Sequence, residues 1–102
     1  MIKLLVMYPW PGDPDSFKKH YLARHLPLCR AIPHTLNIRY AFQPETLEGT
    51  RGHWFCIYEA EYADRKMLNA AKATPEAERA AADVANYSPE PPLVLIYELN
   101  PA

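Results

Sequence analysis

The order of periodic segments constrains the fold of this chain more than any other feature of the sequence. Four stretches alternate large apolar side chains with their neighbours at the two-residue period of a β-strand, namely residues 2–8, 36–42, 54–62 and 93–99. Two stretches between them repeat apolar side chains at helical spacing, namely residues 14–33 and 65–85. The order βαββαβ predicts an α+β fold of the ferredoxin-like type, with a four-stranded antiparallel sheet and helices on one face.

Prolines and capping residues indicate where the helices begin and where they are interrupted. Asp13 before Pro14 is a typical helix start, because the carboxylate accepts from free backbone amides and proline needs no donor in the first turn. Pro27 removes a backbone hydrogen bond inside the first helical segment, so we expect a kink there. Thr74 before Pro75 is a second capping signal and predicts that the second helical segment divides in two.

Length and charge are typical of one small domain. Of the 102 residues 49% are hydrophobic, which suffices for one core, so we expect residues 1–102 to form a single domain. The 11 basic and 12 acidic residues include no run of like charge, which argues against a nucleic-acid partner. No apolar stretch approaches the roughly 20 residues of a membrane span, and a signal-peptide pattern is absent. We therefore expect no membrane partner and a cytoplasmic location.

Motifs for metals and cofactors are absent from the sequence. Cys29 and Cys56 share no C-x-x-C spacing, and His20 and His25 lack the four-residue step that places two ligands on one helical face. A glycine-rich phosphate loop and a G-x-S-x-G elbow are also missing. We therefore expect two reduced, buried thiols, no metal site and no cofactor.

His25 is the first candidate for chemistry. At about 3.6 residues per turn it falls near the middle of the helical arc that faces the sheet. The same arc holds Phe17, Tyr21, Leu22, Leu28 and Cys29. An apolar wall with a tyrosine one turn away moves the pKa of a histidine from about 6.5 and suits it to acid or base chemistry. The alternative is a core histidine that bonds a backbone carbonyl freed at Pro27.

Aromatic side chains and one arginine complete the candidate site. His20 and Arg24 lie one turn apart at the flank of the arc, where they either meet a carboxylate or oxyanion or form a solvated helix edge. Rings with a polar tip suit a small hydrophobic or aromatic organic ligand, and they equally suit a core or a dimer interface. We expect His25 and Tyr21 to be catalytic, and we expect substrate contacts from Phe17, Arg24, Leu28, Tyr40, Trp54, Tyr58 and Tyr87.

A sheet with helices on one face leaves its other face open to water. That face carries several large apolar side chains here, and a small monomer rarely exposes a large apolar patch. We expect two copies to pack sheet against sheet as a homodimer, with Tyr40, Trp54 or their neighbours in the interface.

The string F-x-x-H-Y-x-x-x-H-x-P-L at residues 17–28 resembles the first-helix signature of the EthD-like proteins. Four further segments resemble that family in the same order, at residues 2–9, 32–33, 73–76 and 83–87. The chain departs at His34, where the family often has glycine, and at Tyr62 and Tyr87, where it often has phenylalanine. The resemblance implies a dimeric α/β barrel with a small pocket between the helices and the sheet, and with His25 turned into that pocket.

These residues lead to one main hypothesis of function and two alternatives. We expect a cofactor-independent isomerase or lyase that acts on a small carbonyl, lactone or phenolic compound in catabolism or secondary metabolism. His25 would move the proton, and Tyr21 with Tyr40 or Tyr58 would hold an oxygen. One alternative is a non-catalytic binding or accessory protein for a hydrophobic metabolite. The other, which the resemblance adds, is a small monooxygenase or a haem-binding barrel with His25 on the iron.

Overall fold

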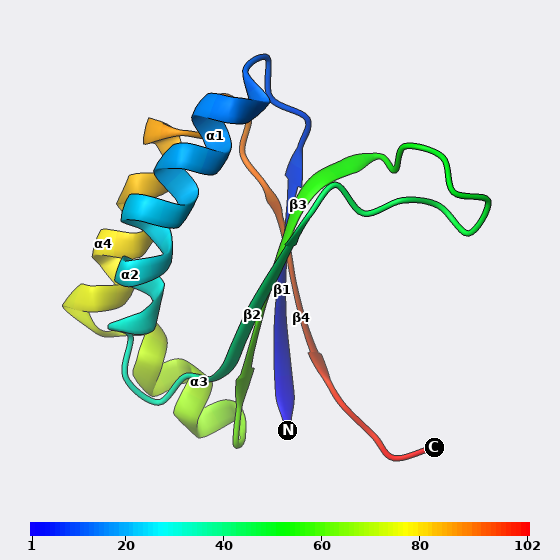
Figure 1. Ribbon diagram of the computed structural model, residues 1–102. Helices are drawn as coiled ribbons and strands as arrows, with labels where there is room; N and C mark the ends of the chain where they lie inside the picture. Colours follow the sequence, from blue (N-terminus) through cyan, green and yellow to red (C-terminus); the bar gives the residue numbers. More distant parts are fainter.

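The computed structural model describes all 102 residues and places the helices on one face of a four-stranded sheet (Figure 1). The strands are β1 (Ile2–Pro9), β2 (Leu36–Phe42), β3 (Trp54–Tyr62) and β4 (Leu93–Glu98). The helical segments are α1 (Pro14–His20), the π-helical turn η1 (Tyr21–His25), α2 (Leu26–Arg30), α3 (Arg65–Lys72), α4 (Pro75–Asp83) and the 3₁₀ turn η2 (Val84–Asn86). This order confirms the predicted βαββαβ fold. A helix with the length and hydropathy of a transmembrane segment does not occur.

β1 lies in the middle of the sheet. The spatial order is β2-β3-β1-β4, and every neighbouring pair is antiparallel. Ile2 of β1 lies opposite Tyr62 of β3 and Glu98 of β4, and the register with β3 stays regular as far as Tyr8. Because side chains alternate across a strand, Leu4, Val6 and Tyr8 point towards the helices, and the odd-numbered residues of β1 point away from them.

Side-chain caps start the helices at the residues that the sequence indicates. The Asp13 carboxylate accepts a hydrogen bond from the Ser16 backbone N–H at 3.1 Å, just before Pro14. Thr74 Oγ1 accepts a hydrogen bond from the Ala77 backbone N–H at 3.2 Å and so separates α3 from α4. The predicted division of the second helical segment is therefore confirmed.

The interruption predicted at Pro27 is a π-helical turn. The Leu26 N–H donates to the Tyr21 carbonyl oxygen, one residue further back than in an α-helix. The wider turn keeps Tyr21 and His25 on the side that faces the sheet, where they are 0% and 4% exposed. Leu22, which regular helical spacing predicts on the buried arc, is 44% exposed, because the wider turn leaves it on the outer side.

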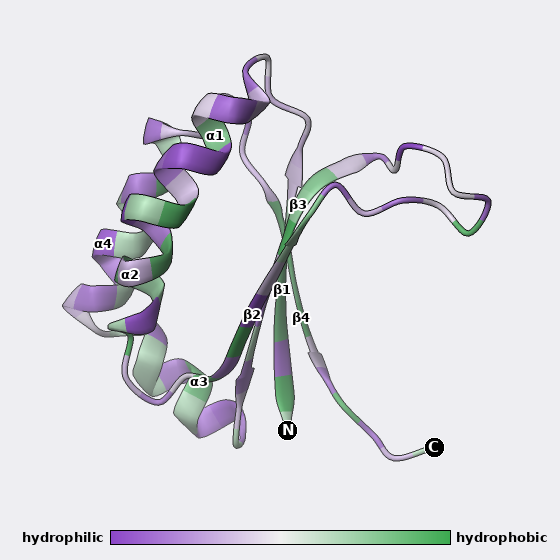
Figure 2. Ribbon diagram, in the orientation of Figure 1, coloured by the Kyte–Doolittle hydropathy of each residue, from purple (hydrophilic) through white to green (hydrophobic).

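Aromatic rings fill the core between the first helical segment and the sheet. Phe17 is 1% exposed, and its ring lies 5.0 Å from that of Phe55 and 4.9 Å from that of Tyr87. Hydrophobic residues gather on the helix sides that face the sheet, and hydrophilic residues lie on the opposite sides (Figure 2). This core holds the helices against the sheet, and the space that remains between the two layers forms a cavity.

The open face of the sheet is apolar along β1 and β4. Leu93, Leu95 and Tyr97 point away from the helices and are 43%, 42% and 40% exposed. Leu93 and Leu95 pair with Met7 and Leu5 of β1, which extends the apolar surface into the middle of the sheet. A contiguous apolar surface of this kind marks a site of interaction.

Tyr40 does not belong to this open face, so that expectation is wrong. Tyr40 pairs with Tyr58, which faces the helices, and paired residues share a face of the sheet. The Tyr40 ring accordingly lies 5.9 Å from the Tyr21 ring, on the helix side. Trp54 is half-buried at the start of β3, with its ring 4.8 Å from that of His53.

Charged side chains occupy the other half of the open face. Lys3 Nζ lies 2.9 Å from Glu59 Oε1 and 3.1 Å from Glu61 Oε2. Arg39 reaches the same two carboxylates at 3.5 Å. The open face therefore combines an apolar half with a half in which the charges are already paired within the chain.

Candidate active site

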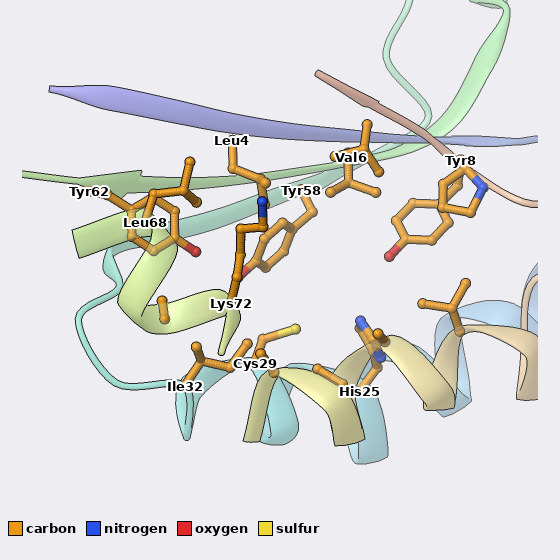
Figure 3. A pocket seen from close by; sticks show the side chains of 17 residues that line it. Leu4, Val6, Tyr8, His25, Cys29, Ile32, Tyr58, Tyr62, Leu68 and Lys72 are labelled. Carbon is orange, nitrogen blue, oxygen red and sulfur yellow. The ribbon is translucent and has the colours of Figure 1, made fainter. Parts of the chain in front are cut away.

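A cavity of about 420 Å³ lies between the helices and the sheet (Figure 3). Of the 17 residues that line it, 14 are hydrophobic. Leu4, Val6 and Tyr8 of β1 and Tyr58 of β3 form the wall on the sheet side, and His25 faces them from η1. The volume and the apolar lining suit a small organic molecule.

His25 is fixed at one ring nitrogen and free at the other. Its Nδ1 lies 3.0 Å from Asp83 Oδ2, and because a carboxylate only accepts, Nδ1 carries the hydrogen. The His25 ring packs against the rings of Tyr87 and Tyr21, at centroid distances of 4.8 Å and 5.4 Å. Nε2 makes no hydrogen bond within the chain. Among the fully buried side-chain polar atoms only the Tyr21 hydroxyl lacks a partner, so the unpaired Nε2 is not fully buried. Nε2 is therefore accessible from the cavity.

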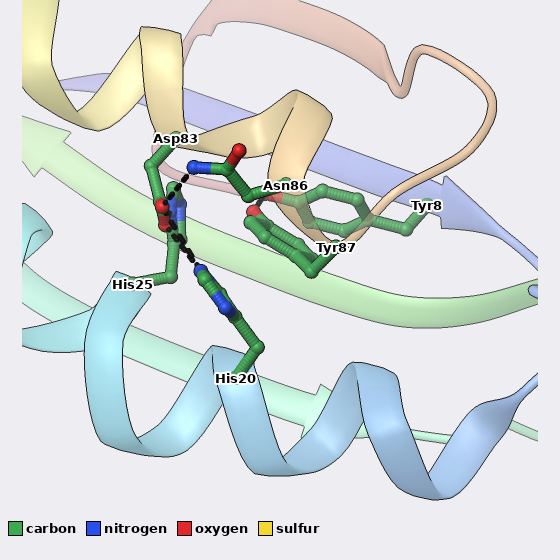
Figure 4. Close-up of polar contacts among 6 residues, drawn as sticks. All are labelled: Tyr8, His20, His25, Asp83, Asn86 and Tyr87. Carbon is green, nitrogen blue, oxygen red and sulfur yellow. Dashed lines mark hydrogen bonds and ion pairs between the residues drawn. The ribbon is translucent and has the colours of Figure 1, made fainter.

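The Asp83 carboxylate joins two histidines of the first helical segment to the end of α4 (Figure 4). Oδ1 lies 2.9 Å from His20 Nε2 and accepts a hydrogen bond from Asn86 Nδ2 at 3.0 Å. His25 is thus not a core histidine satisfied by a backbone carbonyl, which was the alternative for this residue. Groups of three or more His, Cys, Asp or Glu side chains suited to a metal ion do not occur.

Burial and the shared carboxylate set the protonation states of this cluster. Burial lowers the pKa of His25 below its ordinary value of 6.5, and the hydrogen bond and charge of Asp83 offset only part of that shift. Burial alone would raise the pKa of Asp83, but hydrogen bonds from Asn86, His20 and His25 hold it below its ordinary value. At neutral pH a neutral imidazole therefore stands beside an ionised carboxylate, and His25 Nε2 is ready to accept a proton.

Replacing the carboxylate with an amide should lower the pKa of His25 further. We expect the His25 ring to titrate below pH 6.5 in the wild type. In Asp83→Asn it should titrate at a lower pH still, because the variant removes the interactions that favour the imidazolium. Histidine ring signals in proton NMR, followed against pH, give both midpoints. The control Asp15→Asn removes an exposed carboxylate from the first turn of α1 and should leave the midpoint unchanged. A higher midpoint in Asp83→Asn would contradict this account of the cluster.

Two tyrosines bring hydroxyl groups close to the histidine. The hydroxyl oxygens of Tyr8 and Tyr87 are 2.8 Å apart, so one hydroxyl donates to the other. Burial raises the pKa of both phenols, which keeps both protonated. With Tyr87 as the donor, the O–H of Tyr8 remains free for a ligand oxygen, and Tyr8 lines the cavity.

Some of the residues expected at the site line the cavity or support it. Tyr58 lines it together with His25. Phe17 and Tyr21 belong to the core, and the Tyr21 hydroxyl is buried without a hydrogen-bond partner. Leu28 is half-buried against the same core. Tyr21 therefore holds the His25 ring through ring contact and does not line the cavity.

Three of the expected site residues lie away from the cavity. Arg24 is exposed and forms no ion pair, because η1 turns it to the solvent side. Tyr40 is 44% exposed on the edge strand β2. Trp54 is half-buried at the start of β3 and does not line the cavity.

The sequence interpretation missed Tyr8 and Asp83 as site residues. Tyr8 shares the cavity-lining face of β1 with Leu4 and Val6, so strand periodicity alone could have found it. Asp83 lies in the segment 83–87 that resembles the EthD-like proteins. Its contact with His25 joins residues 58 positions apart, and no local spacing indicates such a contact.

Comparisons with known proteins agree with the first-helix signature. No family model matches the chain. An uncharacterized 11.0 kDa protein from the thcB–thcC intergenic region of Rhodococcus erythropolis is 31% identical over 88 residues, which cover 86% of this chain and 84% of that protein. The crystal structure of an EthD family protein from Bacillus halodurans gives a TM-score of 0.89 at 26% identity, covering 98% of this chain and 99% of that chain. The structure of an EthD-like protein from Ralstonia eutropha gives a TM-score of 0.75 at 22% identity, and the match covers 95% of this chain and 89% of that chain.

Two further solved structures share the fold at lower identity. A dimeric ferredoxin-like protein of unknown function from Thermobifida fusca gives a TM-score of 0.71 at 18% identity, covering 96% of this chain and 90% of that chain. The hydroxynitrile lyase from Passiflora edulis gives a TM-score of 0.75 at 14% identity, and the match covers 99% of this chain and 94% of that chain. The Bacillus structure agrees with the signature at residues 17–28, and the chain belongs to the EthD-like family.

Proposed function

We propose that this protein is a cofactor-independent isomerase or lyase in which His25 is the general base. The position of His25 carries the proposal, because Asp83 holds Nδ1 at 3.0 Å and Nε2 is left free at an apolar cavity. A neutral imidazole fixed in one tautomer with one free nitrogen is suited to proton abstraction. The substrate class that suits this cavity is a small carbonyl, lactone or phenolic compound.

Three residues of the site have separate roles in the proposed proton transfer. His25 Nε2 takes a proton from a carbon next to the carbonyl, or from a hydroxyl, and becomes an imidazolium. Asp83 stabilises that positive charge through the Nδ1–H hydrogen bond. The Tyr8 O–H donates to the substrate oxygen on which negative charge develops. The imidazolium then returns the proton to a different carbon in an isomerisation, or to the leaving group in a lyase reaction.

Two further observations support this function. A hydroxynitrile lyase from Passiflora edulis has the same fold, so a lyase reaction is compatible with a site of this architecture. Both cysteines are free and buried, which fits a cytoplasmic protein of small-molecule metabolism.

Deuterium exchange tests the proposal without the natural substrate. In heavy water the wild type should accelerate exchange of the acidic C–H protons of small lactones and aryl ketones, followed by proton NMR. The rate should rise with pH and level off above the pKa of His25, because only the neutral imidazole accepts a proton. The control His53→Ala removes an exposed histidine outside the cavity and should retain the wild-type rate. If no compound in the panel exchanges faster with protein than without it, the catalytic proposal fails.

The apolar lining favours a second candidate, a non-catalytic binding or accessory protein for a hydrophobic metabolite. Turnover separates the two functions. Equal ligand affinity in wild type and His25→Ala, with no exchange in either protein, would establish the binding function. A Soret band on addition of haem would instead favour a haem-binding barrel.

We also propose that the chain forms a homodimer through its open sheet faces. Leu93, Leu95 and Tyr97 form an apolar surface that needs a partner, and a dimeric protein from Thermobifida fusca has the same fold.

Light scattering at micromolar concentration should give twice the chain mass of 11.7 kDa. Leu95→Arg should give the monomer, because it places a charge in the interface. Leu47→Arg, at a fully exposed loop position, should remain dimeric. A monomeric wild type would rule this interface out.

A further inference from the structure

Lys72 is the only lysine or arginine among the residues that line the cavity. Its side chain leaves the last turn of α3 and points towards the sheet (Figure 3). No aspartate or glutamate lines the cavity, and Lys72 takes part in none of the ion pairs of the chain. The ammonium group thus stands at an apolar cavity without an anionic partner.

Lys72 and His25 belong to different ends of the cavity. His25 lies beside Tyr87, whose hydroxyl bonds that of Tyr8 near the end of β1. Lys72 belongs to α3, which follows directly after the end of β3, and the end of β3 pairs with the start of β1. Figure 3 shows the same separation, with Lys72 on the side of Leu4 and His25 below Tyr8. Leu4 and Tyr8 are four strand residues apart, which corresponds to about 13 Å.

We propose that the ligand of this cavity is a small apolar carboxylic acid whose carboxylate pairs with the Lys72 ammonium while its other end meets His25. The inference rests on the proposed function for the role of His25 and adds the substrate class. An ammonium is a point charge with three donors, which suits one carboxylate. A phosphate monoester carries about two negative charges, and no second lysine or arginine lines this cavity to balance them.

The ion pair would fix the orientation of the ligand. Lys72 is exposed, so it lies at the open side of the cavity, and a carboxylate there keeps part of its hydration. The apolar body of the ligand then extends along β1 over Leu4 and Val6 towards Tyr8. With its anionic end held at one side, the ligand presents the same atoms to His25 at every encounter.

Lys72 also has a structural role that the experiment must separate from ligand binding. A cation in the last turn of a helix stabilises that helix end, and Lys72 occupies the last turn of α3. Lys72→Met keeps an unbranched apolar side chain of nearly the same length and removes the ammonium group with its charge and its donors. Thermal melting reports the effect of the variant on the fold, whereas the affinity for charged and neutral probes reports the ion pair.

Calorimetric titration with hydrocinnamate and its neutral amide tests the ion pair. Wild type should bind hydrocinnamate more tightly than hydrocinnamamide, and added salt should narrow the difference. Lys72→Met should weaken hydrocinnamate binding about three- to tenfold and leave the amide unchanged. The control Lys66→Met removes an exposed lysine of the same helix that does not line the cavity, and it should bind both probes as wild type does. Equal loss of both probes in Lys72→Met, or no binding of either probe to the wild type, would overturn the proposal.

Charge reversal and the His25 variant separate this proposal from the proposed function. Lys72→Glu should bind phenylpropylamine more tightly than hydrocinnamate, the reverse of the wild-type preference. His25→Ala should retain the wild-type preference for hydrocinnamate, because its ammonium partner is intact. If wild type and His25→Ala both prefer hydrocinnamate to its amide, and neither protein accelerates proton exchange, the carboxylate site stands and the catalytic function fails. If exchange is observed and the preference is absent, the carboxylate site fails alone.

Discussion

Phe17→Ala should lower the free energy of unfolding by about 3 to 5 kcal/mol, the usual cost of emptying a buried phenylalanine site. Phe17 is 1% exposed, and its ring contacts those of Tyr8, Phe55 and Tyr87 from α1. These neighbours come from β1, β3 and the segment after η2, so they cannot close the space by a shift of one element. The variant therefore loses buried area and also keeps a cavity.

Denaturant unfolding followed by circular dichroism measures this loss. Leu22→Ala is the matched control, because it shortens an apolar side chain in the same helical segment at a position that is 44% exposed. Its loss should stay below about 1 kcal/mol. Similar losses for Phe17→Ala and Leu22→Ala would mean that Phe17 is not at the centre of the core.

His25→Ala should reduce the rate of proton exchange by about 10² to 10⁴-fold, the range that general acid–base catalysis contributes. The variant removes the only ring nitrogen that faces the cavity, while Asp83 keeps its contacts with His20 and Asn86. Added imidazole should restore part of the rate, because it fits the space left by the side chain and supplies the same basic group.

The stability of His25→Ala tells a catalytic histidine from a structural one. Its free energy of unfolding should fall by only about 1 to 2 kcal/mol, because water enters the part of the site that opens to the cavity. Thermal melts of His25→Ala and Phe17→Ala in the same buffer give the comparison. A loss as large as that of Phe17→Ala, together with no rescue by imidazole, would make His25 a residue of the core.

The fold could be predicted from the sequence because the patterns that indicate its strands and helices are local. β2 spans Leu36–Phe42 and β3 spans Trp54–Tyr62, the same limits that the alternation of apolar residues predicts. The division at Thr74 follows from a cap that bonds an amide three residues away. Signals of this kind depend on neighbours in the chain, so they need no knowledge of the packed structure.

The candidate site was accessible only in part, because it depends on contacts between distant segments. Helical spacing places His25 towards the sheet, and the structure agrees. The same spacing fails for Leu22, since it assumes a regular α-helix where the chain forms a π-helical turn. It also gives no indication of Asp83, whose partner is on another helix. Tyr40 was assigned to the open face because the face that a strand presents depends on its pairing, which the sequence does not show.

The π-helical turn also explains how one helical segment contacts the sheet along its whole length. An α-helix advances about 100° per residue, so side chains four residues apart drift by about 40° at each step. Over the three steps from Phe17 to Cys29 the drift would reach about 120°, yet Phe17, Tyr21, His25 and Cys29 are all buried. The wider turn absorbs part of this drift midway. If the same residues formed a regular α-helix, the full drift would bring the aromatic half and the histidine half of the segment out of phase, so the core and the site could not both face the sheet.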